Sequence, residues 1–141
     1  MAGKRRIFIS FDHGDTAQVN GFLGLRNILD NFDFYNHKLD HRVQSRDVEY
    51  VKRVIREDYI GPASVTVVLV GNGTAGSPWV QWEIQESIRQ GKGILGIRLP
   101  GTSGSIPAGI PANAVGSWQP DNFASWIEWA YQQRRGVITP R

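Results

Sequence analysis

The chain has 141 residues, of which 40% are hydrophobic and 21% are charged, a composition typical of an ordinary single-domain globular protein. Its net charge of +3, from 16 basic and 13 acidic side chains, is too small an excess to predict a nucleic-acid partner. The absence of cysteine excludes disulfides, thiolate metal sites and a cysteine nucleophile. Because no apolar run approaches the roughly 18 residues of a membrane span, we expect a cytoplasmic protein with no membrane partner.

The first half of the chain predicts two strands, each followed by a helix. Residues 5–11 form a β-branched and aromatic run typical of a strand, and residues 15–31 repeat apolar side chains at roughly helical spacing. Residues 32–39 predict a second, short strand. A second helix opens at residues 45–47, ends at Gly61 and is expected to turn five side chains inward: Val48, Val51, Val54, Ile55 and Tyr59.

The second half of the chain continues this alternation. Residues 64–70 are almost continuously apolar, which is typical of a strand buried on both faces of a parallel sheet. The glycine-rich residues 71–76 then lead into a helix with Ser77 as its N-cap, Pro78 in its first position and Gly91 at its exit. Further along, we expect a buried strand at 93–99, a loop at 101–119 with a short edge strand near 114–117, and a helix at 120–135.

Alternating strands and helices predict an α/β fold in a single domain over residues 1–141. The simplest arrangement is a flavodoxin-like three-layer sandwich around a mostly parallel sheet of about five strands. In such sheets, ligands bind outside the carboxyl ends of the strands. The loops expected at that edge are residues 12–15, 39–44, 71–76 and 100–111.

The helix at residues 78–90 carries an unusual glutamate. On a helical wheel its core-facing stripe consists of Val80, Ile84, Ser87, Ile88 and Gly91. Glu83 falls on the flank of that stripe, roughly 85° from its centre, and Trp79 lies one turn earlier on the same flank. Trp82 points away from the stripe, which favours a surface or an interface. From spacing alone, Glu83 is either a solvated glutamate, an anion stabilised by the helix dipole, or a functional carboxylate.

Other motifs are weaker. Residues 71–76 have the strand-to-helix position of a phosphate-binding loop but lack the Gly-Lys-Ser/Thr ending of a P-loop, so a plain loop is the favoured interpretation. His13, His37 and His41 have no metal-ligand spacing, and we predict no metal site. His13 and His41 fall in loops at the predicted binding edge, where such side chains contact either ligand or solvent.

Three separated stretches resemble the TIR (Toll/interleukin receptor) domain family. Residues 6–15 (RIFISFDHGD) resemble its first conserved box, and residues 67–71 (VVLVG) resemble its central strand. Residues 77–84 (SPWVQWEI) are similar to the family's Ser-x-Trp-Val-x-x-Glu-Ile helix start and are the most specific of the three. The resemblance covers about residues 4–100, and within the family it is greatest to the short bacterial TIR-like proteins of the Thoeris anti-phage system.

The resemblance implies an enzyme that cleaves NAD⁺ at the nicotinamide N-glycosidic bond and makes a cyclic ADP-ribose isomer or a related signal. NAD⁺ is then a substrate, no cofactor is needed, and the diffusible nucleotide activates a separate effector. The family pattern makes Glu83 the catalytic residue, and we expect Phe11, Asp12, Asn72 and Trp79 to line the substrate pocket. The resemblance also admits a homo-oligomer.

Two other functions stay open. One is a non-enzymatic TIR module that only joins other TIR proteins. The other is a relative of the nucleoside deoxyribosyltransferases, which share this layered plan and use a glutamate nucleophile.

Overall fold

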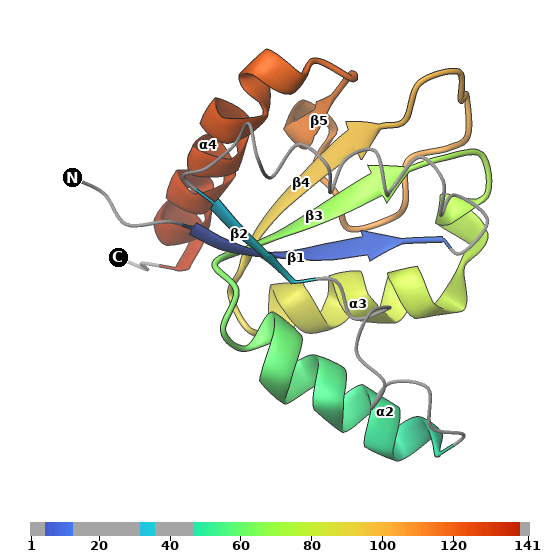
Figure 1. The fold of residues 1–141 in the computed structure, drawn as a ribbon, viewed down its shortest axis with the longest axis vertical. Helices are drawn as coiled ribbons and strands as arrows, with labels where there is room; N and C mark the ends of the chain where they lie inside the picture. The colour runs from blue at the N-terminus through green and yellow to red at the C-terminus, as the bar shows by residue number, and fades with distance from the viewer. Residues whose placement is uncertain (1–4, 13–31, 36–46, 139–141) are drawn as a thin grey trace.

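A five-stranded parallel sheet forms the centre of the molecule. The computed structural model describes residues 5–12, 32–35 and 47–138. The strands lie in the order β2-β1-β3-β4-β5, and every neighbouring pair is parallel (Figure 1). Their bounds are Arg5–Phe11 for β1, Phe32–Tyr35 for β2, Val65–Val70 for β3, Gly93–Arg98 for β4 and Val115–Gly116 for β5. This is the flavodoxin-like strand order, and the predicted fold class is confirmed.

Helices cover both faces of this sheet. On one face lie α2 (Val48–Val54), its continuation η5 (Ile55–Ile60) and α3 (Pro78–Arg89), and on the other lies α4 (Pro120–Ile138) (Figure 1). Two short 3₁₀ turns, η6 (Thr74–Gly76) and η7 (Ala112–Ala114), lie in the loops after β3 and β4. The arrowheads of β1, β3 and β4 point to the same side of the molecule, so the loops that follow them meet at one edge.

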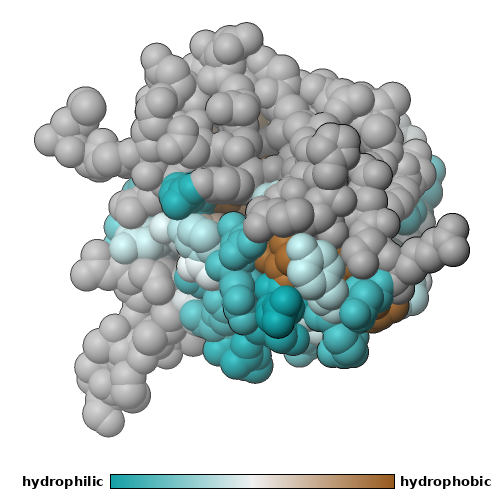
Figure 2. Space-filling view, turned by 60° about the horizontal axis from the view of Figure 1, so that its bottom comes forward, coloured by the Kyte–Doolittle hydropathy of each residue, from teal (hydrophilic) through white to brown (hydrophobic). Residues whose placement is uncertain are grey.

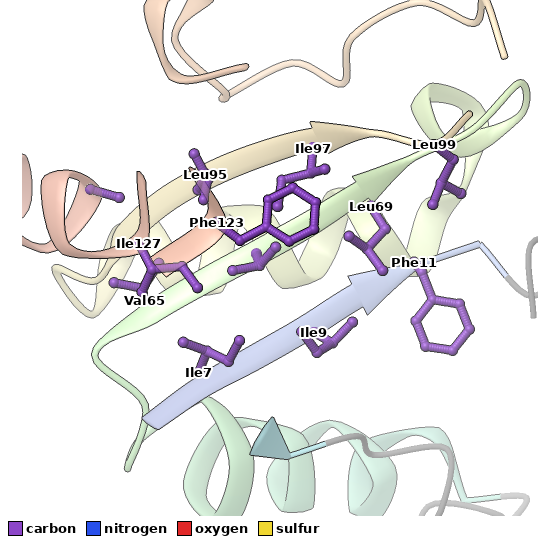
Figure 3. Close-up of a cluster of buried hydrophobic side chains, with 12 residues drawn as sticks. Ile7, Ile9, Phe11, Val65, Leu69, Leu95, Ile97, Leu99, Phe123 and Ile127 are labelled. Carbon is purple, nitrogen blue, oxygen red and sulfur yellow. The ribbon is translucent and has the colours of Figure 1, made fainter. Parts of the chain in front are cut away.

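The two faces of β3 bury different clusters. Val65, Val67 and Leu69 point toward α4 and join a cluster that also includes Phe123 and Ile127 (Figure 3). Val68 and Val70 point the other way and pack with Val80 and Ile84 of α3. All six residues of β3 are buried, as expected for a central parallel strand.

The ends of α3 follow from local sequence chemistry. The Ser77 hydroxyl accepts a hydrogen bond from the Val80 N–H at 3.3 Å, and Pro78 occupies the first helical position. Gln90 is the C-cap, and Gly91 follows it with a φ of 74°, a left-handed conformation that glycine adopts readily. The predicted start and exit of this helix are therefore confirmed.

Several details differ from the predictions. Val48 and Ile88, both expected to face the core, are 51% and 45% exposed. Val48 is the first residue of α2 and lies at the opposite end of that helix from η5. Ile88 is exposed because α3 packs against η5 as well as against the sheet, which turns Glu83 and Glu86 inward instead.

The second predicted helix also changes form within its length: Asp47 caps α2, and the last six residues, η5, are π-helical. Strand β2 ends at Tyr35, and β4 ends at Arg98, one residue before its predicted end. The predicted helix at 15–31, the predicted loop at 39–44 and all three histidines lie outside the described residues.

At Gly93 the backbone of α4 lies directly against the backbone of β4. A Cβ atom there would lie 2.6 Å from the Ala130 carbonyl oxygen, too near for any real contact. Gly93→Ala should therefore lower the free energy of unfolding in urea by about 1–3 kcal/mol. Gly76→Ala is the matched control, because a Cβ atom there meets nothing within 4 Å, and its effect should stay within about 0.5 kcal/mol. Equal losses in the two variants would contradict this account of the β4–α4 contact.

Candidate functional site

Glu83 is buried between α3 and β1. Only 1% of its surface is exposed, so the interpretation of a solvated flank residue is wrong. The Ser10 hydroxyl, on β1, donates a hydrogen bond of 2.6 Å to Glu83 Oε1. Ser10 is itself fully buried. Residues 73 positions apart in the chain therefore meet through one short hydrogen bond inside the protein.

Burial dominates the ionisation of Glu83. Removal from water disfavours the charged form and raises the pKa of Glu83 from 4.5 to about 8, although the Ser10 hydrogen bond acts in the opposite direction. Glu86, one turn along the same helix, behaves differently. There a hydrogen bond from Arg89 is the main cause that lowers the pKa, and Arg56 adds to it. Of these two buried glutamates, Glu83 is mostly neutral at pH 7 and Glu86 is ionised.

The alternation of β1 explains why Ser10 reaches Glu83. Ile7, Ile9 and Phe11 pack in the cluster under α4, whereas Phe8 packs with η5 on the opposite face. Ser10 falls in the same alternate set as Phe8 and so points toward α3. Ser10 was not among the predicted site residues, although this period of two was a signal that could have identified it.

A second polar contact fixes α3 over the sheet. The Ser87 hydroxyl donates to the Glu83 carbonyl oxygen at 2.8 Å, and it lies 2.7 Å from the Thr66 hydroxyl of β3. Since the one hydroxyl proton of Ser87 is used toward Glu83, Thr66 is the donor in the second contact. Both hydroxyl groups are buried and satisfied, and they hold the backbone of Glu83 in register with β3.

The predicted pocket residues are only partly brought together. Phe11 is 4% exposed and lies in the cluster on the α4 side of the sheet (Figure 3). The alternation of β1 places it on the face opposite Ser10 and Glu83. Asp12 follows directly at the end of β1, where its Oδ2 lies 3.2 Å from a Cβ built on Gly73. Asn72 and Trp79 are both exposed, in the loop after β3 and in the first turn of α3.

The loop after β3 is held in place by its own side chains. The buried Thr74 hydroxyl accepts from the Gly71 N–H at 2.7 Å, and the N–H groups of Gly76 and Ser77 bond to carbonyl oxygens within the loop. These three donors are therefore not available to a phosphate group. The loop is closer to the plain connection expected from its sequence than to a phosphate cradle.

The loops after β3 and β4 are joined to each other. Asn72 Oδ1 accepts from the Ser103 N–H at 2.9 Å, and the Thr102 hydroxyl donates to the carbonyl oxygens of Leu99 and Val70. A Cβ on Gly104 would lie 2.5 Å from the Gly71 carbonyl oxygen, so the two backbones are in direct contact. The side chain of Asn72 is therefore exposed and also holds the two loops together through its hydrogen bond with Ser103.

Trp82 connects α3 to α2 and η5, and Trp79 lies against it on α3. The rings of Trp79 and Trp82 meet edge to face with centroids 6.0 Å apart, and Trp79 is 38% exposed. Trp82 is partly buried against η5, with the cations of Lys52 and Arg56 5.5 and 5.7 Å from its ring centroid. The described surface on this side of the molecule is mostly hydrophilic, with only small hydrophobic areas (Figure 2).

Other features lie apart from Glu83. A cavity of about 340 Å³ opens at the opposite, amino-terminal edge of β4, between Ile88, Gly93 and Trp129. Among the described residues, no group of three acidic or histidine side chains is placed to hold a metal ion. No helix in the described part of the chain is both long and apolar enough to cross a membrane.

Comparison with known proteins finds similarity to one family model and to solved structures. The family model described as "Thoeris protein ThsB, TIR-like domain" matches residues 8–104. The fold is similar to the crystal structure of the TIR domain of the Toll-related receptor TRR-2 from Hydra magnipapillata, with a TM-score of 0.62 and 13% sequence identity. That similarity covers 92% of this chain and 97% of the other. No curated protein matches the chain.

The pKa of Glu83 predicts a pH dependence of stability. In the unfolded chain Glu83 loses its proton near pH 4.5, whereas in the folded protein it keeps the proton up to about pH 8. The free energy of unfolding should therefore fall as the pH rises between these values. Glu83→Gln should remove this dependence and stabilise the protein at pH 8 by at most about 5 kcal/mol. Urea unfolding measured from pH 4.5 to 8.5 provides the test.

The exposed Glu57 supplies the matched control. Glu57→Gln makes the same chemical change outside the core and should leave the pH dependence as in the natural protein. Parallel stability curves for the natural chain and Glu83→Gln would show that Glu83 is not held neutral.

Proposed function

The chain belongs to the family of the Thoeris protein ThsB TIR-like domain, a TIR family of anti-phage defence, and on that premise we propose that it is an enzyme that cleaves NAD⁺. TIR domains often cleave this dinucleotide, and they typically associate with other TIR proteins. The observation that supports an enzyme over a module that only binds other proteins is the burial of Glu83. A carboxyl group buried beside the ligand-binding edge of a parallel sheet costs stability, and catalysis gives a reason to retain it.

The proposed reaction breaks the bond between the anomeric carbon of the ribose and the nicotinamide nitrogen. The electron pair of that bond goes to the nitrogen, so nicotinamide leaves as a neutral molecule and needs no general acid. The ribosyl carbon becomes positively charged, with the character of an oxocarbenium ion. An ionised Glu83 facing this carbon, or bound to the ribose hydroxyl groups, would stabilise the charge at low local dielectric.

The substrate itself helps to ionise Glu83. In the free protein, with a pKa of about 8, only about a tenth of the molecules carry the carboxylate at pH 7. The nicotinamide ring of NAD⁺ is positively charged, and a nearby positive charge favours the ionised form of a carboxyl group. The Ser10 hydrogen bond acts in the same direction. Glu83 is then stabilised as an anion when the cation arrives.

The fate of the ribosyl cation decides the product. Addition of water, with loss of a proton, gives ADP-ribose. Attack by a nucleophilic atom elsewhere on the same molecule, also with loss of a proton, gives a cyclic isomer. Exclusion of water and a folded substrate favour the second route. We propose that such a nucleotide is the signal that activates a separate effector in the infected cell, with NAD⁺ as substrate and no cofactor or metal ion.

Trp79 is the better placed of the two aromatic candidates. It lies one turn before Glu83 on α3 and exposes 38% of its surface, whereas the ring of Phe11 is buried on the other face of the sheet. A flat nicotinamide or adenine ring stacked on an exposed indole would leave the ribose near Glu83. We therefore assign the stacking role to Trp79 and keep Asp12 and Asn72 as pocket residues.

The activity test measures nicotinamide release from NAD⁺ by the purified chain, alone and with extract from phage-infected cells. Glu83→Gln should lower the rate at least about a hundredfold, because transition-state stabilisation is lost while the fold remains. Glu57→Gln should retain the natural rate. Release that survives Glu83→Gln would remove Glu83 from the mechanism. No release under either condition would favour a TIR module that only binds other TIR proteins.

The pH dependence of the activity tests whether Glu83 acts in its ionised form. If Glu83 acts as a carboxylate, kcat/KM should rise with pH and level off above about pH 8, because this parameter reports the free enzyme. Ser10→Ala removes a hydrogen bond that favours the anion, so it should move the rise to higher pH and lower kcat/KM at pH 7. An unchanged profile in Ser10→Ala would show that the hydroxyl does not tune Glu83.

A further inference from the structure

Arg98 is the last residue of β4, and one nitrogen of its guanidinium group is buried. Its side chain is partly buried, and its Nη1 atom is inaccessible to solvent yet has no hydrogen-bond partner within the described parts of the chain. No described acidic group forms an ion pair with it either. Two partly buried or exposed arginines of the helices differ, because Arg56 and Arg89 both pair with Glu86. A guanidinium kept in this state is costly for the free protein.

The alternation of β4 places Arg98 on the same side of the sheet as Glu83. Leu95 and Ile97 belong to the cluster under α4, as does Leu99. Arg98 lies between Ile97 and Leu99 and therefore points to the opposite face, toward α3. Val70, its partner across the β3–β4 ladder, packs with Val80 and Ile84 of α3.

The register gives the separation of Arg98 from Ser10, the partner of Glu83. Ser10 pairs with Val68, and Val68 pairs with Gly96, so these three residues form one row across the sheet. Arg98 lies two residues beyond that row, toward the carboxyl edge. With about 4.8 Å between strands and about 3.3 Å per residue, the Cα atoms of Ser10 and Arg98 are roughly 12 Å apart. One ribose and a long arginine side chain together bridge such a distance.

We propose that Arg98 binds the diphosphate group of the dinucleotide. This inference rests on the proposed function, since it deepens the substrate site next to Glu83. The planar guanidinium donates two parallel hydrogen bonds to phosphate oxygens, and an anion at this position would satisfy the buried nitrogen and its charge together. With the ribosyl carbon at Glu83, the diphosphate lies toward β4 and the adenine beyond it.

ADP is the probe for this site, because it carries the diphosphate without the bond that is cleaved. Its affinity for the full chain can be measured by isothermal titration calorimetry. Arg98→Met should weaken ADP binding at least about tenfold. The ADP affinity of Arg98→Lys should lie between those of Arg98→Met and the natural chain. Arg53→Met is the matched control, because Arg53 is an exposed arginine of α2 that lies over the ring of Tyr50. It should bind ADP as the natural chain does.

Two further readouts separate recognition of the diphosphate from a structural role. Nicotinamide riboside lacks phosphate, so its affinity should be the same for the natural chain and Arg98→Met. The thermal unfolding midpoint of Arg98→Met should equal or exceed that of the natural chain, because an unsatisfied buried donor has been removed. If Arg98→Met does not fold, Arg98→Lys carries the test through its ADP affinity.

Equal ADP affinity in the natural chain and in a folded Arg98 variant would overturn the proposal, as would an absence of ADP binding by the natural chain. These outcomes are distinct from failure of the proposed function. ADP binding that needs Arg98, without nicotinamide release, would support the diphosphate site and contradict the enzyme. Nicotinamide release that needs Glu83 but has the same KM for NAD⁺ in Arg98→Met would contradict the diphosphate site alone.

Discussion

The hydrogen bond from Ser10 to Glu83 is the contact on which the candidate site depends. It joins β1 to α3 in the buried interior, and it favours an ionised Glu83 against the effect of burial. The geometry around it is fixed by ordinary packing. Val80 and Ile84 lock one side of α3 onto β3, and the Thr66–Ser87 contact holds the helix in register. A carboxyl group held this firmly loses little entropy when substrate arrives.

Much of the fold could be predicted from the sequence because it follows from local patterns. The uninterrupted apolar run of β3 and the Ser77, Pro78 and Gly91 signals of α3 each correspond to one physical cause, and these elements formed as expected. The burial of Glu83 could not be predicted, because a helical wheel assumes a single buried face. Helix α3 has a wider buried surface, because it lies over β1, where Ser10 meets Glu83, and also packs against η5, and both contacts are long-range. The contact with η5 explains why Ile88 is exposed.

The residues of the site differ in how readily the sequence identified them. The helical wheel marked Glu83 as unusual, and the resemblance of residues 77–84 to a known family then made it the catalytic candidate, whereas Ser10 was detectable from the alternation of β1. Arg98 carried no sequence signal, since its unsatisfied nitrogen is a property of the packed structure. Glu83 and Arg98 share one feature: each is a charged type of residue with a buried polar atom in its side chain. Groups of this kind lower stability, and they become favourable when a ligand of complementary charge is bound.

The central claim is that burial keeps Glu83 neutral and that a cationic substrate ionises it. The most direct test is a ¹³C NMR titration of the Glu83 carboxyl carbon, assigned by its disappearance in Glu83→Gln. The titration is done without ligand and with a carbocyclic NAD⁺ analogue that cannot be cleaved. The account predicts a midpoint near pH 8 in the free protein and a lower midpoint with the analogue bound. A midpoint near 4.5 in the free protein, or one that the bound cation leaves unchanged, would contradict it.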